Sequence, residues 1–331
     1  MSEMNYTRFF GEGYREEFLY VETTEDGLFR AGQNGVDGIW VPRDKKVAFV
    51  EKEGQVLCRV SSLMGYPAYY PLREPKFTAP AKAVLMDLDG TSVHSEWFWM
   101  WIIEQTTARM LGKSDFKLEP EDEPFVSGHS VMEHLQYCLN KYDSSHSHTV
   151  DEARELYLEI TRYEMAEIIA GRGKDGAFKP AHHLKEFLYA LKDNGVKIGL
   201  VTSGLTEKAM PEIVSAFRTL DMGSPYDFYD AIISAGTAFG PGSVGTLSEL
   251  EIKPHPWLYA ETGRIGLGMD SEQGCVMALE DSSAGVVAAR LAGYPCIGME
   301  GGNIRQSGVT CLCADMCGDL LDVLPRILGD R

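Results

Sequence analysis

The chain has 331 residues, of which 44% are hydrophobic and 24% are charged, an ordinary composition for a globular protein of roughly two domains. No apolar run approaches the ~18 residues that a membrane helix needs, and a formal net charge of −18 repels phosphate backbones and anionic membranes. We therefore expect neither a membrane protein nor a nucleic-acid-binding protein. The charged N-terminal stretch MSEMNYTRFFGEGYREE does not fit a secretion signal, so we expect a cytoplasmic protein.

The seven cysteines do not form the framework of a small disulfide-stabilised domain, so we expect reduced thiols. Cys311, Cys313 and Cys317 are the exception, because their spacing would suit a metal if a fourth ligand and a CxxC knuckle were present. Both are missing, and the alternation in VTCLCADM favours a strand over residues 309–316.

Residues 1–80 have the pattern of a β-rich region. Short β-rich runs are separated by the turn-forming segments PRD and KEG and end in a loop with several prolines, PLREPKFTAPAK. An extension that covers a sheet edge or forms a dimer contact is favoured over a substrate gate. The region is also the candidate contact of a homo-oligomer. The expected strands cover residues 18–24, 37–41, 45–51 and 55–61.

From residue 82 the pattern changes to strands that alternate with amphipathic stretches, which predicts a parallel sheet. Such sheets bind ligands at the carboxyl ends of their strands. Residues 97–183 lack comparable strand runs and are expected to form a helical insertion. The expected strands lie in 83–87, 196–201, 229–235, 274–280 and 294–299, and the expected helices in 98–111, 129–142 and 150–170.

The most informative segment is DLDGT at residues 87–91. Asp87 and Asp89 follow an apolar run, and Gly90 permits the sharp turn that lets both carboxylates reach one reacting centre. Asp87 is the candidate nucleophile, and Asp89 can protonate a leaving group and later deprotonate water. Taken alone, the motif also fits a solvated turn or a simple cation loop.

Polar residues stand at the ends of further strands. The Thr-Ser-Gly segment at 202–204 offers a hydroxyl and free backbone amides to phosphoryl oxygens. Lys253 precedes two prolines that stiffen its loop, which suits a fixed cation beside a phosphate. Glu280 and Asp281 end the run GCVMAL, and their carboxylates either bind Mg²⁺ beside Asp87 or cap the next helix.

Four ordered motifs, DLDGT, LVTSG, KPHP and LEDSSAGVVAARLAG, resemble the haloacid dehalogenase (HAD) superfamily, specifically its β-phosphoglucomutase-like phosphatase branch. The resemblance covers roughly residues 82–327. It implies an α/β fold class with a Rossmann-like parallel sheet core, an inserted helical cap and hydrolysis through an aspartyl-phosphate. With the appended N-terminal β-rich region, the expected units are residues 1–80, the core at 81–95 and 184–331, and the cap at 96–183.

The resemblance also implies the role of each matching residue. Asp87 is the nucleophile, and Asp89 is the general acid/base and a backbone ligand of the metal. Glu280 is a further metal ligand or a neighbour of the ligands. The candidates for catalysis are Asp87, Asp89, Thr202 and Lys253, those for Mg²⁺ are Asp87, Asp89, Asp281 and Glu280, and those for substrate are Ser203, Gly204, His129, Ser130 and Arg162.

The sequence departs from the family pattern at several positions. Asp89 argues against a true dehalogenase, which has no alkoxide to protonate. Trp99 stands where β-phosphoglucomutases have a cap-hinge histidine, so mutase activity is not favoured. His94 replaces a common aspartate and is either a solvent-facing hinge residue or a substrate contact, and Trp257 replaces the usual aspartate of the third motif.

Substrate choice is expected to lie in the cap, which closes over the leaving group and excludes water. His129 and Ser130 follow Gly128 at the position of the specificity loop, and Arg162 and Lys174 are the candidate cations. Each of these residues also fits a position without a part in substrate binding, at a helix start or on a solvated helix face. Trp97 and Trp99 either stack on a sugar or pack the first cap helix.

The sequence thus predicts a Mg²⁺-dependent phosphatase that acts on a small phosphorylated metabolite, a sugar or polyol phosphate. The enzymatic alternative is a β-phosphoglucomutase-type phosphotransferase, in which a second sugar hydroxyl takes the place of water. A non-catalytic partner-binding HAD scaffold is the alternative of another class, and the intact set of acidic and basic residues counts against it.

Overall fold

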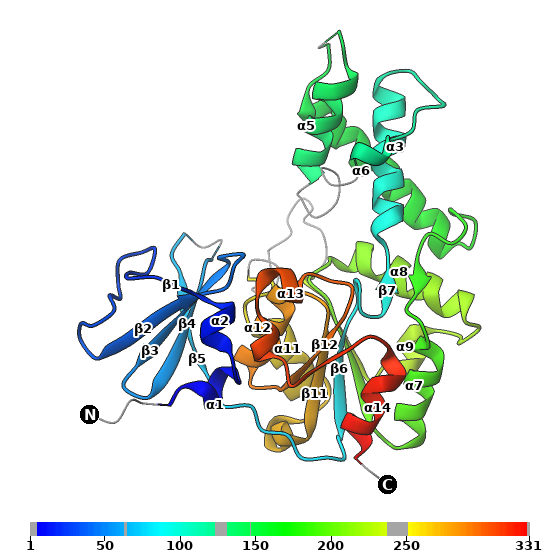
Figure 1. Ribbon diagram of the computed structural model, residues 1–331. Coiled ribbons are helices and arrows are strands. Elements are labelled where there is room, and N and C mark those ends of the chain that lie inside the picture. Colours follow the sequence, from blue (N-terminus) through cyan, green and yellow to red (C-terminus); the bar gives the residue numbers. More distant parts are fainter. Residues whose placement is uncertain (1–4, 63–64, 123–130, 146, 237–250, 330–331) are drawn as a thin grey trace.

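The computed structural model describes residues 5–62, 65–122, 131–145, 147–236 and 251–329 (Figure 1). Its central sheet has six strands in the order β10-β9-β6-β11-β12-β13, and each pairs in parallel with its neighbours. The chain runs outward from β6 through β9 to β10 and then returns to place β11 on the other side of β6. The strands are β6 (Ala83–Asp87), β9 (Lys197–Val201), β10 (Ala231–Ile233), β11 (Val276–Glu280), β12 (Cys296–Met299) and β13 (Asp315–Cys317).

Both faces of this sheet are buried. On β6, Val84 and Met86 face an apolar cluster with residues of α7, α8 and α14, whereas Ala83 and Leu85 face a second cluster with residues of α11 and α12. Strands buried on both faces are continuously apolar, which is why these runs were recognisable in the sequence. The elements around the sheet are α7 (Leu184–Asp193), α8 (Thr206–Thr219), α9 (Pro225–Phe228), α11 (Trp257–Ala260), η2 (Glu261–Gly266), η3 (Asp270–Cys275), α12 (Ser283–Ala292), α13 (Ile304–Ser307), η4 (Thr310–Leu312) and α14 (Leu320–Leu328).

The N-terminal region forms a separate antiparallel sheet in the order β1-β2-β3-β4-β5. The predicted fold class, a parallel α/β core with an N-terminal β-rich region, is confirmed. The strand β5 was not expected, because Pro71 lies within it; β5 is an edge strand, where a residue without an N–H is tolerated. The elements are α1 (Thr7–Phe10), α2 (Tyr14–Glu17), β1 (Leu19–Tyr20), β2 (Val36–Val41), β3 (Val47–Lys52), β4 (Gln55–Val60) and β5 (Ala68–Leu72).

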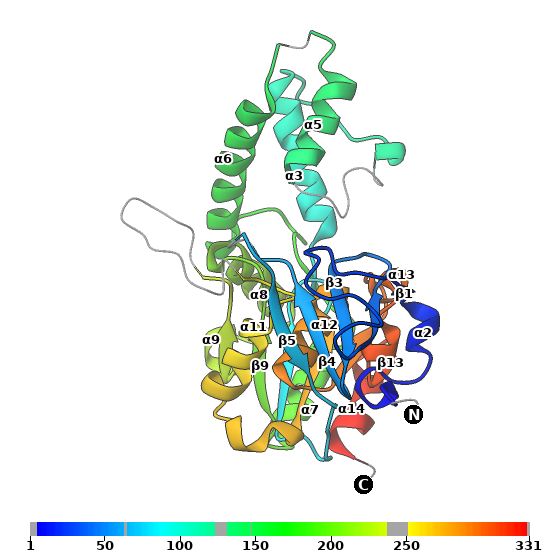
Figure 2. The ribbon, with the colours of Figure 1, turned by 90° about the vertical axis from the view of Figure 1, so that its left-hand side faces the viewer.

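The long helices α3 (Glu96–Met110), α5 (Val131–Tyr142) and α6 (Val150–Ile169) stand together above the parallel sheet (Figure 2). The chain enters and leaves this helical segment through a short antiparallel pair of strands, in which His94 lies opposite Lys179. Helix α6 begins with a capping box, because the Thr149 hydroxyl accepts from the Glu152 N–H and the Glu152 carboxylate accepts from the Thr149 N–H. The elements are β7 (Val93–His94), α3 (Glu96–Met110), η1 (Pro120–Asp122), α5 (Val131–Tyr142), α6 (Val150–Ile169) and β8 (Lys179–Pro180).

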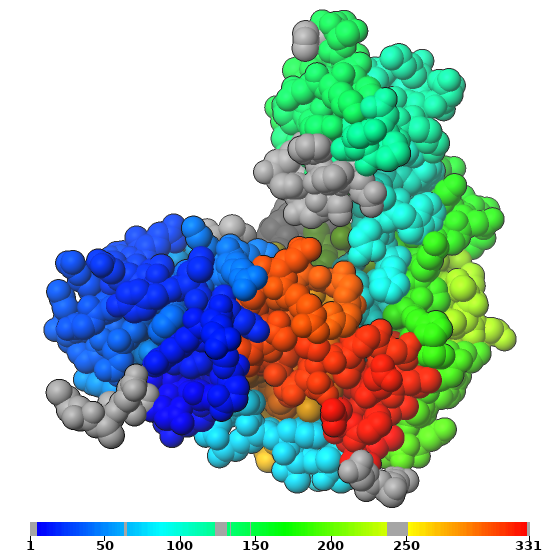
Figure 3. All heavy atoms as spheres, viewed as in Figure 1, coloured from blue at the N-terminus to red at the C-terminus, as the bar shows by residue number. Residues whose placement is uncertain are grey.

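The N-terminal sheet packs directly against the α12 side of the core (Figure 3). One apolar cluster contains Phe10, Phe49 and Leu72 from the N-terminal region together with Val286 and Leu312 from the core. The N-terminal region and the core therefore share apolar packing. The domain boundary predicted at residue 80 stays a prediction.

The segment with three cysteines is not the single strand that its alternation suggested. Residues Thr310–Leu312 form a 3₁₀ turn, and the strand β13 begins only at Asp315. Tertiary contact explains the difference, since the Leu312 carbonyl accepts from the buried Arg290 guanidinium at 2.7 Å. All seven cysteines are free thiols. Within the described ranges, no helix is both long and apolar enough to cross a membrane.

Candidate active site

Asp87 ends strand β6 and is 5% exposed. Its side-chain Oδ1 accepts a hydrogen bond from Lys253 Nζ, and its backbone carbonyl accepts from the Ser92 hydroxyl at 2.5 Å. The turn that follows needs Gly90, whose φ is +85° and where a Cβ would come within 2.1 Å of Asp281 Oδ2. The glycine of the DLDGT motif therefore lets the first and the last motifs approach each other.

Lys253 is held between two buried carboxylates. Its ammonium contacts Asp87 and lies 2.6 Å from Glu280 Oε1, which also accepts from the Tyr259 hydroxyl at 2.6 Å. The other oxygen of Glu280 accepts from the Ser282 hydroxyl at 2.9 Å. Glu280 is fully buried, and its contacts join Lys253, α11 and the loop that follows β11.

Negative charge exceeds positive charge at this point. Burial and the Glu280 carboxylate raise the pKa of Asp87 well above its ordinary value, although Lys253 acts in the opposite direction. Burial and Glu280 likewise raise the pKa of Asp281 to about 7. Carboxylate oxygens of Asp87, Glu280 and Asp281 lie within 4.8 Å of one another. This all-oxygen donor set, with more charge than one lysine neutralises, fits a hard divalent cation.

Asp89 lies in the turn beyond β6, beside the entrance to the helical segment. Its Oδ1 accepts a hydrogen bond from the Ser95 hydroxyl at 3.0 Å. Burial acts to raise the pKa of Asp89, but the Lys208 ammonium and the hydrogen bond from Ser95 are among the effects that outweigh it, so the pKa lies below its ordinary value. The Lys253 ammonium acts in the same direction, so Asp89 lies within the field of the Asp87–Lys253 pair.

The Thr-Ser-Gly segment adopts a tight turn after β9. Thr202 is 1% exposed, and its hydroxyl accepts from the Gly204 N–H at 2.9 Å. The Ser203 hydroxyl accepts from the backbone N–H of Lys253 at 3.4 Å, which joins this turn to the lysine loop. The structure thus brings Asp87, Lys253, Glu280 and Asp281 together and joins Ser203 to the lysine loop, while the predicted roles of these residues stay predictions.

Of the candidates in the helical segment, the structure describes only some. His129 and Ser130 lie outside the described residues, as does Gly128. Arg162 is exposed on α6. Trp99 on α3 packs on Phe98 and Phe178, and its ring lies 4.5 Å from Lys208 Nζ. The predicted roles of these residues in substrate binding stay predictions.

Sequence reasoning missed Lys208 and Glu212 on α8. Glu212 is fully buried beside Asp89, and burial together with the Asp89 charge raises its pKa well above the ordinary value. The sequence did contain an indication of this, because Glu212 lies on the apolar face of α8 that also contains Ala209, Ile213 and Ala216. A carboxyl group within an apolar stripe indicates a buried polar site.

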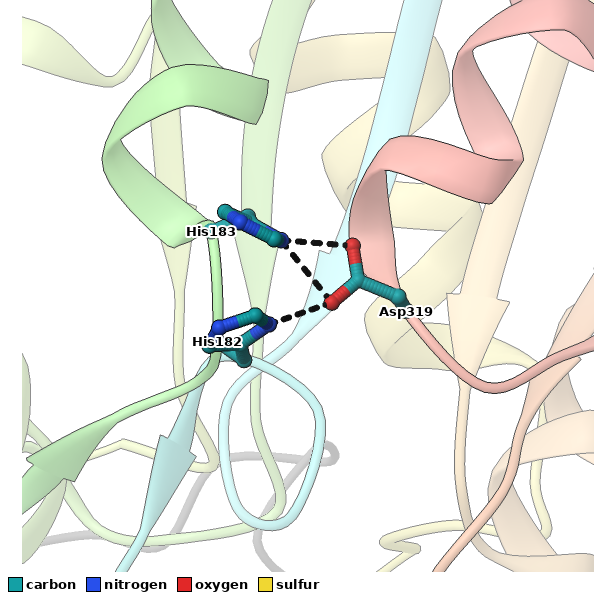
Figure 4. A group of neighbouring side chains, drawn as sticks. All are labelled: His182, His183 and Asp319. Atoms are coloured by element: carbon teal, nitrogen blue, oxygen red, sulfur yellow. Dashed lines mark hydrogen bonds and ion pairs between the residues drawn. The ribbon is translucent and has the colours of Figure 1, made fainter.

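A second group of ligand-type side chains lies away from Asp87. The rings of His182 and His183 are directed at the Asp319 carboxylate, with Nδ1 to oxygen distances of 2.6 Å and 2.9 Å (Figure 4). Asp319 also caps α14 by accepting from the Leu321 N–H at 2.8 Å. The His182 side chain is 79% exposed. These hydrogen bonds tie the start of α7 to the start of α14, and we assign the group a structural role.

The fold and the site together define an α/β enzyme that places a buried carboxylate, a lysine and further carboxylates at the ends of parallel strands. A family model described as haloacid dehalogenase-like hydrolase matches residues 84–299. The chain therefore belongs to the haloacid dehalogenase-like hydrolases. The predicted family is confirmed, and so is the prediction of an enzyme of the hydrolase class.

Individual relatives agree with this assignment. The chain is 28% identical over 219 residues to a validoxylamine A 7'-phosphate phosphatase from Streptomyces hygroscopicus subsp. limoneus, covering 66% of this chain and 85% of that protein. The fold of the present chain is similar to that of a predicted phosphoglycolate phosphatase from Haemophilus somnus 129pt. The TM-score is 0.53, the sequence identity is 19%, and the similarity covers 75% of this chain and 99% of that chain. A HAD-superfamily hydrolase of subfamily IA from Geobacter sulfurreducens PCA gives a TM-score of 0.51, 15% identity, and coverage of 76% and 99%.

Proposed function

We propose that this protein is a Mg²⁺-dependent phosphatase that hydrolyses a small sugar or polyol phosphate through an aspartyl-phosphate intermediate. The observation that carries the proposal is the buried contact of Lys253 with Asp87 and Glu280 at the carboxyl ends of β6 and β11. This is the point at which the strand order reverses, where open α/β sheets bind their ligands. The similarity to a named phosphatase supports phosphate-ester chemistry.

The proposed reaction has two steps, formation of the aspartyl-phosphate and its hydrolysis. An Asp87 carboxylate oxygen attacks phosphorus in line and the bond from phosphorus to the ester oxygen breaks. Asp89, which takes up a proton when the negative phosphoryl group of the substrate lies beside it, gives that proton to the departing alcohol. In the second step Asp89 takes a proton from water, whose oxygen attacks phosphorus and releases phosphate from Asp87. Lys253 neutralises charge on Asp87 and on the phosphoryl oxygens, and the Thr202 hydroxyl with the Ser203 amide holds those oxygens.

The carboxylates of Asp87 and Asp281 and the backbone carbonyl of Asp89 would hold Mg²⁺. Glu280 serves as a further ligand or, through its contact with Lys253, as a neighbour of the ligands. When bound, the cation supplies positive charge that stabilises the phosphoryl group during transfer.

Selection of the leaving group is proposed to rest with the helical segment 96–183, acting as a cap. Asp89 lies at the entrance to this segment and is hydrogen-bonded to Ser95, the residue that precedes α3. The leaving alcohol must therefore lie between the core and this segment. Because the core contacts only the phosphoryl group, the side chains above it determine which alcohol fits.

The test is phosphate release from a panel of sugar, polyol and short-acid phosphates, with and without Mg²⁺, by the wild type and Asp87→Asn. We expect Mg²⁺-dependent release that Asp87→Asn lowers by roughly 10⁴-fold or more, since the nucleophile is lost. The exposed Asp193→Asn is the matched control and should retain full activity. Release that needs a sugar bisphosphate activator would identify a phosphotransferase instead, and no release by folded protein with metal would contradict the proposal.

A further inference from the structure

The N-terminal sheet contacts the loop that carries Lys253. Tyr70 lies on β5, and its hydroxyl lies 2.9 Å from Nδ1 of His255, which is 3% exposed. The two rings meet edge to face, with centroids 5.7 Å apart. The indole of Trp257 packs edge to face on the same tyrosine at 6.3 Å. Residues on both sides of Pro256 are therefore anchored to one side chain of the N-terminal sheet.

The other ring nitrogen of His255 also contacts the N-terminal region. Nε2 lies 3.0 Å from the Ser61 carbonyl and contacts the Glu251 carboxylate, which in turn accepts from the Ser62 hydroxyl. Because both neighbours of Nε2 are acceptors, Nε2 carries the proton and Nδ1 accepts from the Tyr70 hydroxyl. Burial lowers the pKa of His255, which is consistent with this neutral form.

These contacts flank Lys253 on both sides in the sequence. Glu251 precedes it by two residues and His255 follows it by two, and both side chains are almost fully buried. The lysine side chain itself contacts core residues, since its ammonium bonds Asp87 and Glu280 and lies over the Tyr259 ring. The backbone from which Lys253 extends is thus held by the N-terminal sheet, while its ammonium serves the active site.

A second contact from the same sheet reaches the loop after β11. Asp44, between β2 and β3, accepts from the Ser283 hydroxyl at 2.6 Å. Ser283 is 2% exposed and follows Asp281 by two residues. The N-terminal region therefore contacts both the lysine loop and the start of α12, directly after Glu280 and Asp281, which is more than covering a sheet edge requires.

We propose that Tyr70 is a positioning residue for Lys253 and acts through His255. Its catalytic consequence rests on the proposed phosphatase function, whereas its effect on the lysine loop does not. A lysine displaced by a fraction of an ångström neutralises the transferring phosphoryl group less well, and misplacement of about 1 Å costs up to ~100-fold in rate.

The experiment compares Tyr70→Phe with Tyr69→Phe in the full chain. Tyr69 is the neighbouring tyrosine on β5, and its hydroxyl bonds Asp26 within the N-terminal region at 2.7 Å. Each variant loses one hydroxyl and one hydrogen bond, but only Tyr70 contacts the lysine loop. We expect Tyr70→Phe to lower kcat about tenfold with little change in KM, and Tyr69→Phe to leave both unchanged.

Variants of His255 test whether Tyr70 acts on Lys253 through this histidine. His255→Ala should lower kcat at least as much as Tyr70→Phe, and adding Tyr70→Phe to His255→Ala should lower it no further. His255→Gln, which keeps an acceptor and a donor, should restore part of the activity. Equal kcat in the two tyrosine variants, or additive losses in the double variant, would overturn the proposal.

Amide hydrogen exchange gives a readout that does not depend on turnover. We expect faster exchange of the Lys253 and His255 amides in Tyr70→Phe but not in Tyr69→Phe. If the wild type releases no phosphate from any substrate, the proposed function fails while this comparison still decides the positioning role. Unchanged exchange in Tyr70→Phe would show that the tyrosine does not hold the loop.

Discussion

At the scale of single residues, Lys253 is the most constrained side chain of the site. It is a cation with 7% exposure between two carboxylates with 8% and 0% exposure, so each charge depends on the others for compensation. Such a group is costly to disturb, because removing one partner leaves a buried charge without its counter-ion. The same arrangement keeps the ammonium in place for a phosphoryl group.

Lys253→Met is therefore expected to lower both activity and stability. The free energy of unfolding should fall by about 3 kcal/mol, measured by urea denaturation monitored with circular dichroism. Lys192→Met is the matched control, since Lys192 pairs with Asp230 at side-chain exposures of 31% and 35% and should cost at most about 1 kcal/mol. Equal losses in the two variants would show that the Lys253 ion pairs are not specially stabilising.

The core of the site was predictable because its residues are contiguous with recognisable strands. Asp87, Asp89 and Glu280 follow apolar runs directly, and the sheet brings strand ends together whatever the intervening loops do. Tyr70 and His255 were not predictable, since they lie 185 residues apart and meet only through packing. Glu212 was missed for a related reason, because its proximity to Asp89 depends on how α8 packs beneath the turn.

At the scale of elements, the N-cap of helix α14 shows that the stability of a helix start can depend on the charge of one carboxylate. Asp319 caps its first turn and accepts from two histidine rings, and these hydrogen bonds, working against the effect of burial, lower the pKa of Asp319 to about 2. A carboxyl with a lowered folded pKa contributes stability above its unfolded pKa near 3.8, and this stability is lost as the pH falls through the folded value.

Asp319→Asn keeps a capping oxygen but removes the charge. We expect the variant to be less stable than the wild type at pH 6 and the difference to shrink steadily as the pH is lowered from about 5 to 3. Thermal unfolding across this range measures the difference. Asp322→Asn, an exposed position of the same helix, is the control for loss of charge alone. A difference between Asp319→Asn and wild type that does not vary with pH would contradict the assignment.

The sequence predicted helices and strands well where every residue of the element is buried in a regular pattern. It predicted them less well where one tertiary contact determines the local backbone conformation. The helix α6 and strands β6 and β11 follow their sequence patterns closely. Strand β5 was hidden by Pro71, which only an edge position allows. The turn at Thr310–Leu312 was mistaken for a strand, because the Arg290 contact that shapes it comes from a distant helix.

At the scale of the whole molecule, the N-terminal sheet and the core share one apolar cluster. The buried Arg290 of α12 adds polar contacts across the same boundary, donating to the Phe9 carbonyl at 2.6 Å and the Arg73 carbonyl at 3.3 Å. Burial lowers the pKa of Arg290 to about 10, so the guanidinium remains charged at neutral pH. The core face beneath the N-terminal sheet is therefore apolar, with a buried cation in its midst.

A chain that lacks residues 1–72 should not fold cooperatively. Removal of the N-terminal sheet exposes apolar residues such as Val286 and leaves Arg290 without its Phe9 partner. We expect a broad unfolding transition and strong binding of the dye ANS, both measured beside the full chain. A sharp transition with native-like near-ultraviolet circular dichroism would instead show that the parallel-sheet core folds by itself.

The shared cluster also has a consequence for synthesis on the ribosome. Phe10, Phe49 and Leu72 emerge early, but their partners around Val286 and Leu312 are translated about 240 residues later. At roughly 5–20 residues per second, the aromatic face of the nascent sheet waits on the order of 10–50 s for its partner surface. Because of this order of the chain, we expect chaperones that shield apolar segments to bind the nascent protein during translation.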